Sequence, residues 1–225
     1  MTATGEPLEI QVGERVGRVS GLLLRPPEPT AGYVLAHGAG AGMTHSFMES
    51  IARALVTRGI ATLRYQFPYV EAGGRRPDPP AVLLATVRAA VARARELLPS
   101  LRLFAGGKSM GGRMTSQASA EGQLGELAGL IFLGFPLHPP KRPAIERAEH
   151  LERVAQPMLF LQGTRDDLAD LALIREVCGR LGDRCTLHVV EGADHSFGVL
   201  KRSGRTGSEV LEELADTIVS WCRES

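Results

Sequence analysis

The stretch that decides the fold is GKSMG, at residues 107–111. It follows an apolar run, Leu101–Ala105, that is typical of a buried strand, and it leads into Gly111–Ala120, whose small residues favour a helix. A serine on so tight a strand-to-helix turn needs neighbours without bulk two positions before and after it, because larger side chains would collide with the strained backbone. The pattern predicts that Ser109 presents its hydroxyl above the carboxyl end of the strand.

The five letters alone are weak evidence. Glycine occupies 26 of the 225 positions, so GKSMG is also compatible with an ordinary glycine-rich turn. The residues that follow the other expected strands separate the two interpretations. A serine hydroxyl becomes a nucleophile only when a base accepts its proton and a carboxylate orients that base.

A carboxylate and an imidazole each follow an expected strand. Met158–Gln162 leads to Asp166, and Thr186–Val190 leads to His195. The resulting order, serine then aspartate then histidine, is the one produced by the topology in which GxSxG turns occur. Asp167 competes with Asp166 as the acid; the G-x-x-D spacing favours Asp166, and Asp167 is expected to start the next helix.

The strand Tyr33–Ala36 ends in His-Gly-Ala-Gly, a turn flexible enough to direct a main-chain amide inward. The N–H groups of Ala39 and Met110 are expected to form an oxyanion hole. His37 is expected to be a structural imidazole bonded to this loop. Asp194, beside the base, is expected to make a local turn bond.

Strands alternate with helices along the chain, which predicts an α/β fold with a mostly parallel, doubly wound sheet, helices on both faces, and no large cap. We expect one domain over residues 1–225. Leu8–Val12 and Val16–Leu24 are expected to pair antiparallel at one edge. The other expected strands are Tyr33–Ala36, Ile60–Tyr65, Leu101–Ala105, Leu130–Leu133, Met158–Gln162 and Thr186–Val190.

The expected helices have recognisable ends. One begins at a Ser46/Glu49 capping box and stops at Gly59, and the last begins at a Thr206/Glu209 capping box. Gln66–Pro80 is rich in proline and is expected to be a loop. The remaining helical predictions are Ala81–Leu98, Gly111–Ala120, Leu168–Leu181 and a short helix at the end of Phe135–Arg153.

The whole chain resembles the α/β-hydrolase superfamily. It is most similar to the dienelactone-hydrolase-like branch that includes the family of the testis-expressed protein thirty and subunit three of the non-specific-lethal complex. The matching stretches are LAHGAGAGMTHSFM, RYQFPYVEAGGRRPDPP, FAGGKSMGGRM, LGFPLHPPKRP, HLERVAQPMLFLQGTRDDL and VEGADHSF. The resemblance implies a Ser-His-Asp hydrolase with Ser109, His195 and Asp166 at the matching positions. Dienelactone hydrolases themselves use cysteine as nucleophile, so their substrate is not carried over to a chain with Ser109.

Two groups of side chains are candidates for substrate binding. Lys108 and Arg113 lie close to the turn in sequence and would bind an anionic substrate or hold a neighbouring loop. Aromatic and apolar residues of two loops would line an acyl site or merely pack beneath those loops. These residues are Phe67, Tyr69, Phe135 and Leu137.

Composition excludes several other classes of protein. With 26 Lys and Arg against 25 Asp and Glu, the net charge is +1, so no nucleic-acid partner is expected. No apolar run reaches the length of a membrane span, and the N-terminus lacks the features of a secretory signal. Three cysteines without C-x-x-C spacing indicate reduced thiols in a cytoplasmic protein. No histidine spacing indicates a metal, and the glycines at 38–42 do not match a dinucleotide fingerprint, so no cofactor is expected.

The sequence therefore predicts a serine hydrolase that acts on a small acyl substrate through an acyl-enzyme. A carboxylester is the first expectation, with thioester and amide left open, and the protein is expected to be a monomer or a small homo-oligomer. The alternative, motivated by the complex subunits within the resembling family, is a binding or scaffold protein of hydrolase fold with little or no turnover.

Overall fold

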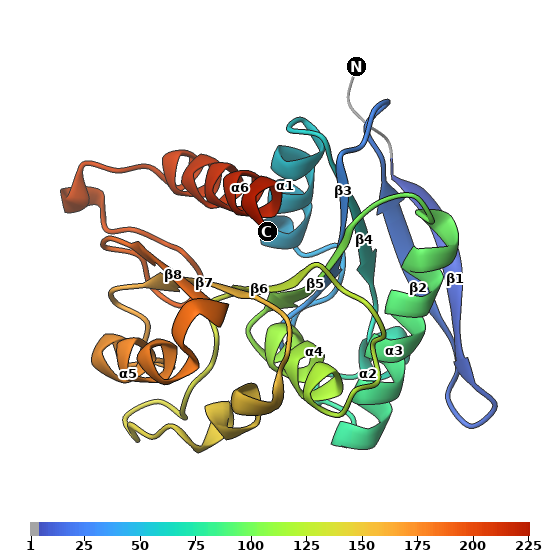
Figure 1. The fold of residues 1–225 in the computed structure, drawn as a ribbon, viewed down its shortest axis with the longest axis horizontal. Helices are drawn as coiled ribbons and strands as arrows, with labels where there is room; N and C mark the ends of the chain where they lie inside the picture. Colours follow the sequence, from blue (N-terminus) through green and yellow to red (C-terminus); the bar gives the residue numbers. More distant parts are fainter. Residues whose placement is uncertain (1–4) are drawn as a thin grey trace.

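Eight strands form one sheet in the computed structural model of the protein, which describes residues 5–225 (Figure 1). The strands lie in the order β1-β2-β4-β3-β5-β6-β7-β8. The bounds are β1 Glu6–Gly13, β2 Gly17–Leu24, β3 Ala31–Ala36, β4 Ile60–Tyr65, β5 Leu103–Lys108, β6 Gly129–Leu133, β7 Met158–Gly163 and β8 Cys185–Val190. Every strand predicted from the sequence is confirmed. The largest difference is β5, which continues beyond Ala105 and ends at Lys108.

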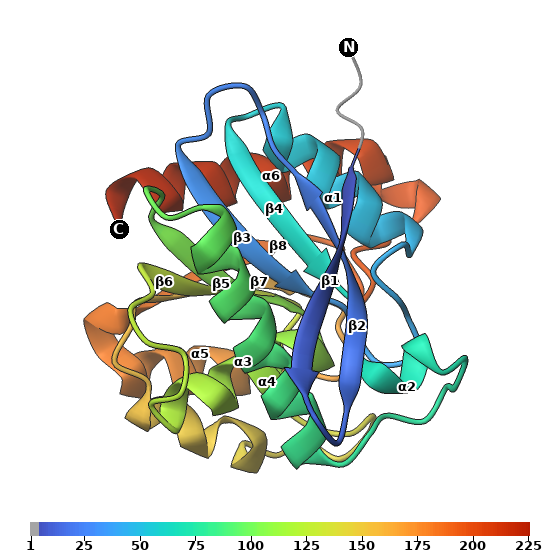
Figure 2. The same cartoon turned by 90° about the vertical axis from the view of Figure 1, so that its right-hand side faces the viewer.

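The sheet is mostly parallel, as predicted. β1 pairs antiparallel with β2, and β2 pairs antiparallel with β4, so this hairpin forms one edge (Figure 2). All neighbouring strands from β4 through β8 run parallel. Parallel strands need crossover connections, and these bring the carboxyl ends of β3, β5, β6, β7 and β8 to the same edge of the sheet.

Helices cover both faces of the sheet, as Figure 1 shows. α1 and α6 pack on one face around a core that contains Tyr33 and Phe104. α3, α4, α5 and the 3₁₀ segment η1 pack on the other, around Phe132 and Phe160. The connections between the described strands contain no separate cap domain. The helical bounds are α1 Ser46–Val56, α2 Pro68–Glu71, α3 Pro80–Leu97, α4 Met110–Ala120, η1 Glu146–Arg153, α5 Leu171–Leu181, η2 Gly182–Arg184, η3 Lys201–Ser203 and α6 Gly207–Glu224.

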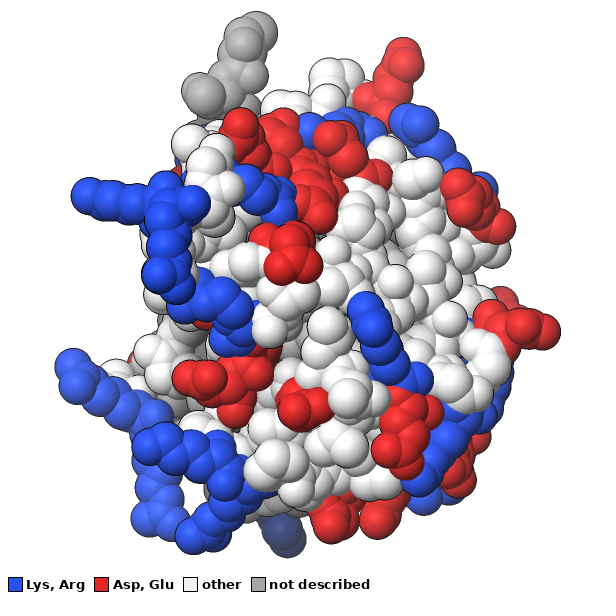
Figure 3. Space-filling model, turned by 90° about the vertical axis from the view of Figure 1, so that its left-hand side faces the viewer, with Lys and Arg blue, Asp and Glu red and all other residues white. Residues whose placement is uncertain are grey.

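Acidic and basic side chains are interspersed over the face that holds α5, β8 and the start of α6 (Figure 3). One cluster on this side joins the edge strand β8 to α6. Glu213 of α6 accepts a hydrogen bond from Nε2 of His188 on β8 at 2.7 Å, and it also pairs with Arg205. These contacts attach the outermost strand to the final helix.

Two helix starts differ from the sequence prediction. α1 is capped by His45 instead of Ser46, because Nδ1 of His45 accepts the hydrogen bond from the N–H of Phe47 at 3.3 Å. α5 begins at Leu171, and its cap is Asp170 instead of Asp167. Ahead of this start, Asp166 accepts the N–H of Leu168 at 2.8 Å, and the helix starts only after Asp170.

Two segments differ in helix type from the sequence prediction. The loop predicted over Gln66–Pro80 contains the short helix α2, and the helix predicted before Arg153 is a 3₁₀ segment. Between residues 5 and 225, no helix combines the length and the apolar character needed to cross a membrane. The first four residues of the N-terminus, part of the stretch expected to carry no secretory signal, lie outside the described residues.

Replacing Thr206 by alanine tests the cap of α6. Thr206 and Glu209 form the predicted capping box: Oγ1 of Thr206 accepts from the N–H of Glu209 at 3.2 Å, and the Glu209 carboxylate accepts from the N–H of Thr206 at 2.6 Å. Thr206→Ala is expected to lower the free energy of unfolding by about 1 kcal/mol in urea denaturation. Thr206→Ser keeps the hydroxyl and serves as the control. Equal stability of the two variants would contradict the assignment.

Candidate active site

Ser109 lies on a sharp turn between β5 and α4. Its backbone angles are φ 50° and ψ −118°, in a region that non-glycine residues rarely adopt. Such a conformation costs about 1–3 kcal/mol and persists only when its surroundings hold it. Here the N–H of Ser109 donates to the carbonyl of Leu133 at 3.2 Å, and its carbonyl accepts from the N–H of Arg113 at 3.1 Å. The turn is thus fixed to β6 on one side and to α4 on the other.

Two glycines of the GKSMG motif are required by the close approach of β3. A Cβ on Gly107, whose φ is 144°, would lie 2.1 Å from the carbonyl oxygen of Ala36. A Cβ on Gly111 would lie 2.6 Å from the carbonyl oxygen of His37. Both distances are too short for any side chain. The structure therefore supplies the physical reason for the small residues on either side of Ser109.

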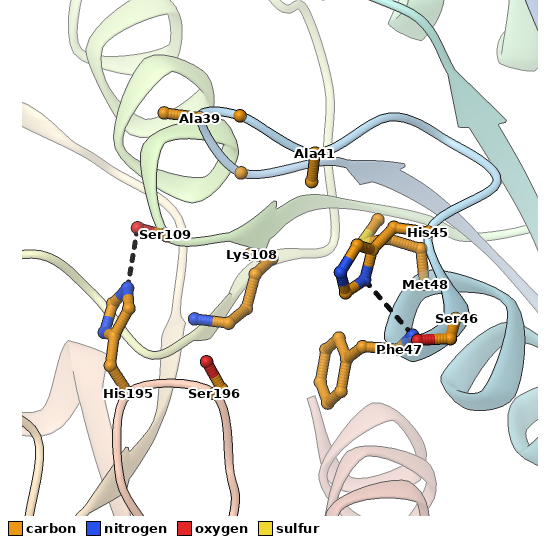
Figure 4. A pocket seen from close by; sticks show the side chains of 12 residues that line it. Ala39, Ala41, His45, Ser46, Phe47, Met48, Lys108, Ser109, His195 and Ser196 are labelled. Carbon is orange, nitrogen blue, oxygen red and sulfur yellow. Dashed lines mark hydrogen bonds between the residues drawn. The ribbon is translucent and has the colours of Figure 1, made fainter. Parts of the chain in front are cut away.

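Ser109, His195 and Asp166 form one chain of hydrogen bonds. Nε2 of His195 lies 2.9 Å from Oγ of Ser109, as Figure 4 shows, and Nδ1 of His195 lies 2.7 Å from Oδ2 of Asp166. Because an ionised carboxylate can only accept, Nδ1 carries the proton and Nε2 is free to accept from the serine hydroxyl. The structure brings together all three side chains that the sequence analysis selected at separate strand ends.

The Asp166 carboxylate is fixed from three directions. Its side chain is completely buried. Besides His195, it accepts the Nε2–H of Gln162 at 2.5 Å and the N–H of Leu168 at 2.8 Å. The oxygen of the same Gln162 side chain accepts the N–H of Phe135 at 3.0 Å. Sequence reasoning missed Gln162; the available signal was a polar residue at the end of the otherwise apolar strand MLFLQ.

The two remaining aspartates behave differently. Asp167 is exposed and makes no contact with His195, so the structure selects Asp166 as the partner of the imidazole. Asp194 makes the local turn bonds that the sequence predicted, since its Oδ1 accepts from the N–H groups of Ser196 and Gly198, each at 2.9 Å. These bonds shape the turn that carries His195.

His37 is structural, as expected. Its Nδ1 donates to the carbonyl of Gly38 at 2.8 Å, and its Nε2 accepts from the N–H of Phe67 at 3.1 Å. Burial lowers the pKa of His37 to about 4, so the ring is neutral at pH 7 and holds the loop after β3. The N–H groups of Ala39 and Met110 donate no hydrogen bond to any residue described. Ala39 lines the same pocket as Ser109, and Met110 follows Ser109 directly in the chain.

A pocket of about 430 Å³ opens beside Ser109. Figure 4 shows its wall, formed by the loop after β3, the start of α1, the end of β5 and the turn of His195. Phe47 of α1 stacks on Phe197 with ring centroids 5.7 Å apart. The lining residues are Gly38, Ala39, Gly40, Ala41, His45, Ser46, Phe47, Met48, Lys108, Ser109, His195 and Ser196. His45, Phe47, Met48 and Ser196 were not candidates in the sequence, because only the fold brings α1 against the His195 turn.

Most of the expected substrate-binding residues do not line this pocket. Lys108 does, whereas Arg113 points elsewhere and is partly buried near Arg147, which with burial lowers its pKa. The four aromatic and apolar loop residues do not line this pocket but pack in the core on the other face of the sheet, as the second of the two alternatives has it; a role in substrate binding stays a prediction. These are Phe67, Tyr69, Phe135 and Leu137. Their burial follows from aromatic packing: Phe67 contacts the rings of His37 and Tyr65, and Phe135 contacts those of Phe132 and Phe160.

Over residues 5–225, no group of three histidine, cysteine, aspartate or glutamate side chains is placed to hold a metal ion.

Residues 29–223 match the family described as alpha/beta hydrolase domain. The chain therefore belongs to this family.

Solved structures agree with this fold. A dienelactone hydrolase from Anabaena variabilis superposes with a TM-score of 0.79 at 20% identity, covering 100% of this chain and 99% of that one. A serine hydrolase without lid from Xanthomonas campestris gives 0.74 at 21% identity, covering 96% and 94%. An esterase domain from Rhodothermus marinus gives 0.74 at 17% identity, covering 98% of each. At these identities the likeness establishes the fold.

Gly111 and Gly179 provide a matched test of the close approach at the turn. Both are helical glycines, but a Cβ on Gly179 would meet no atom within 4 Å. Gly111→Ala is expected to destabilise the fold by about 2–4 kcal/mol and to disturb Ser109. Gly179→Ala is expected to be neutral or to stabilise by up to about 1 kcal/mol. Chemical denaturation of both variants checks the contrast, which similar midpoints would refute.

Proposed function

We propose that the protein is a serine hydrolase that cleaves a small carboxylester. The observation that carries this proposal is the hydrogen-bonded chain from the Ser109 hydroxyl through His195 to the buried carboxylate of Asp166. Each member has the environment that its role requires: a partly exposed nucleophile on a strained turn, an imidazole in the accepting tautomer, and a fixed carboxylate. Membership of the alpha/beta hydrolase domain family supports the same reaction class.

Acylation begins with attack of Ser109 Oγ on the ester carbonyl carbon. His195 Nε2 accepts the hydroxyl proton as the new C–O bond forms, and Asp166 stabilises the imidazolium without itself becoming protonated. The carbonyl oxygen becomes an oxyanion beside the N–H groups of Ala39 and Met110. These donors have no other partner in the described chain, so they need not break a bond to receive it.

Collapse of the tetrahedral intermediate breaks the bond to the alcohol, and His195 returns its proton to the leaving oxygen. The products are the free alcohol and an acyl ester of Ser109. Water then attacks this ester, with His195 again accepting a proton, and a second collapse releases the carboxylic acid and restores the serine hydroxyl.

Pocket size supports a small substrate. The cavity of about 430 Å³ lies at the lower end of ordinary ligand sites, and the described chain carries no cap domain that would cover a long acyl chain. The names of the esterase domain and the dienelactone hydrolase among the similar structures support an ester over a thioester or an amide. Membership of the narrower testis-expressed protein thirty branch, and the scaffold role known within it, stay predictions.

Labelling with a fluorophosphonate tests the nucleophile. The purified protein is expected to form a stable covalent adduct and to release nitrophenol from 4-nitrophenyl acetate, and Ser109→Ala is expected to do neither. Ser116→Ala, which removes a buried hydroxyl bonded to His150 at 2.7 Å, is the control for non-specific labelling. A folded wild-type protein that neither labels nor turns over ester, yet co-purifies with a stoichiometric partner, would support the scaffold alternative.

Asp166→Asn tests the orientation of the imidazole. The amide can place an N–H opposite Nδ1 and favour the wrong tautomer, so kcat is expected to fall by about 10³- to 10⁴-fold. Asp167→Asn removes the same charge from the exposed neighbour and is expected to leave kcat within about twofold. Steady-state ester hydrolysis by both variants makes the comparison. A larger loss of kcat in Asp167→Asn than in Asp166→Asn would contradict the assignment of Asp166 as the acid.

A further inference from the structure

The ammonium group of Lys108 is buried and lacks a partner. Nζ is shielded from solvent and makes no hydrogen bond to any described residue. It lies over the ring of Phe197, 5.7 Å from the ring centroid, which is a cation–π contact. A buried charge without a partner is costly and needs an explanation, and one explanation is a ligand that pairs with it when bound.

No described carboxylate hydrogen-bonds to this ammonium, although two are near enough to act on it through their charge. Asp166 is committed to His195, Gln162 and the N–H of Leu168, and Oδ1 of Asp194 is committed to two N–H groups of its own turn. Burial lowers the pKa of Lys108 to about 8, while the fields of Asp166 and Asp194 act in the opposite direction. Lys108 is therefore charged at neutral pH, at an energetic cost that another anion would relieve.

Lys108 belongs to the pocket that contains the proposed nucleophile. Its stem lines the cavity beside Ser109, and Figure 4 shows its amino group directed between the side chains of His195 and Ser196. A Cβ placed on Gly134 would lie 3.1 Å from Nζ and 3.5 Å from Nδ1 of His195, so the cation and the imidazole share one neighbourhood. The stem of a lysine is flexible, and pairing with a ligand in the cavity requires rotation about its terminal bonds.

Other polar groups of the pocket also favour an anion. Nδ1 of His45 accepts the hydrogen bond that caps α1, so in the neutral ring Nε2 carries the proton and can only donate. Ser196 contributes an exposed hydroxyl. Among the residues that line this pocket in the described structure, none is an aspartate or a glutamate. Phe47 and Met48 supply an apolar surface between the polar groups.

We propose that the substrate is an ester bearing a second, ionised carboxylate, and that Lys108 is the residue that selects it. The proposal rests on the serine hydrolase function proposed above and narrows it to a substrate class. The carboxylate would enter the pocket beside Ser109 and pair with the ammonium, while the ester carbonyl lies on Ser109. An unpaired cation in the free protein thus becomes a paired cation in the complex.

Matched substrates test whether the protein prefers a carboxylate over a neutral amide, either on the acyl side or on the alcohol side of the ester bond. Monoethyl succinate is compared with ethyl succinamate, and 4-acetoxybenzoate with 4-acetoxybenzamide; each pair differs only in carboxylate against neutral amide. The wild-type protein is expected to show a kcat/KM at least about tenfold higher for the carboxylate in one pair, which identifies the acyl or the alcohol side. No preference in either pair would overturn the proposal.

Lys108→Met then assigns the preference to its residue. The measured quantity is the ratio of kcat/KM for carboxylate and amide, so a general loss of activity cancels. This ratio is expected to fall at least about tenfold, whereas Lys201→Met, which removes an exposed lysine on η3, is expected to keep the wild-type ratio. A ratio that survives in Lys108→Met would overturn the proposal.

Wild-type pH dependence provides a second measurement if Lys108→Met does not fold. The ratio is expected to decline as pH rises through about 8 and the ammonium loses its proton. The other titratable groups that face Lys108 or share its pocket are His45, His195, Asp166 and Asp194. The effect of His195 and Asp166 on catalysis itself is common to both substrates and cancels in the ratio. A ratio unchanged from about pH 7 to 10 would contradict a role for Lys108.

Failure of this proposal is distinguishable from failure of the proposed function. Fluorophosphonate labelling together with equal rates for carboxylate and amide would retain the serine hydrolase and reject the charge preference. Absence of both labelling and turnover would reject the function on which the preference rests.

Discussion

The end of β3 lies against the turn between β5 and α4, and this close approach constrains the rest of the site. It admits no side chain at Gly107 or Gly111, and it helps hold Ser109 at a positive φ. The same segment continues into the loop of Ala39, so one contact positions both Ser109, the proposed nucleophile, and Ala39, a proposed oxyanion donor. The cost of the strained backbone is offset by the packing of β3, which is fully buried, and of β5, which is buried except at its last residue, Lys108.

Much of the fold could be predicted because the ends of the strands and helices are marked by clear changes of residue type in the sequence. Buried strands such as Ile60–Tyr65 are short β-branched or apolar runs, and each is followed by a residue that breaks the pattern. Since parallel strands place their carboxyl ends together, Ser109, Asp166 and His195 could be expected to meet although they lie far apart in sequence. The hydrogen bonds among them agree with that expectation.

The parts that sequence could not predict depend on side-chain direction between elements. His45 caps α1 through its ring, a use that no propensity distinguishes from that of the neighbouring Ser46. Phe67 and Phe135 follow strands, as Ser109 does, yet their bulk turns them into the core instead of the pocket. Pocket residues such as Phe47 arrive from α1, whose contact with the His195 turn exists only in three dimensions.

The side chain of Gln162 links the loop after β6 to the Asp166 carboxylate. One amide group spans two segments: its oxygen receives the N–H of Phe135, and its nitrogen donates to Asp166. The connection after β6 and the carboxylate behind His195 are therefore coupled through this one side chain. Altered packing in that connection is therefore expected to move the carboxylate that orients His195, so changes at residues outside the pocket lining can alter the proposed activity.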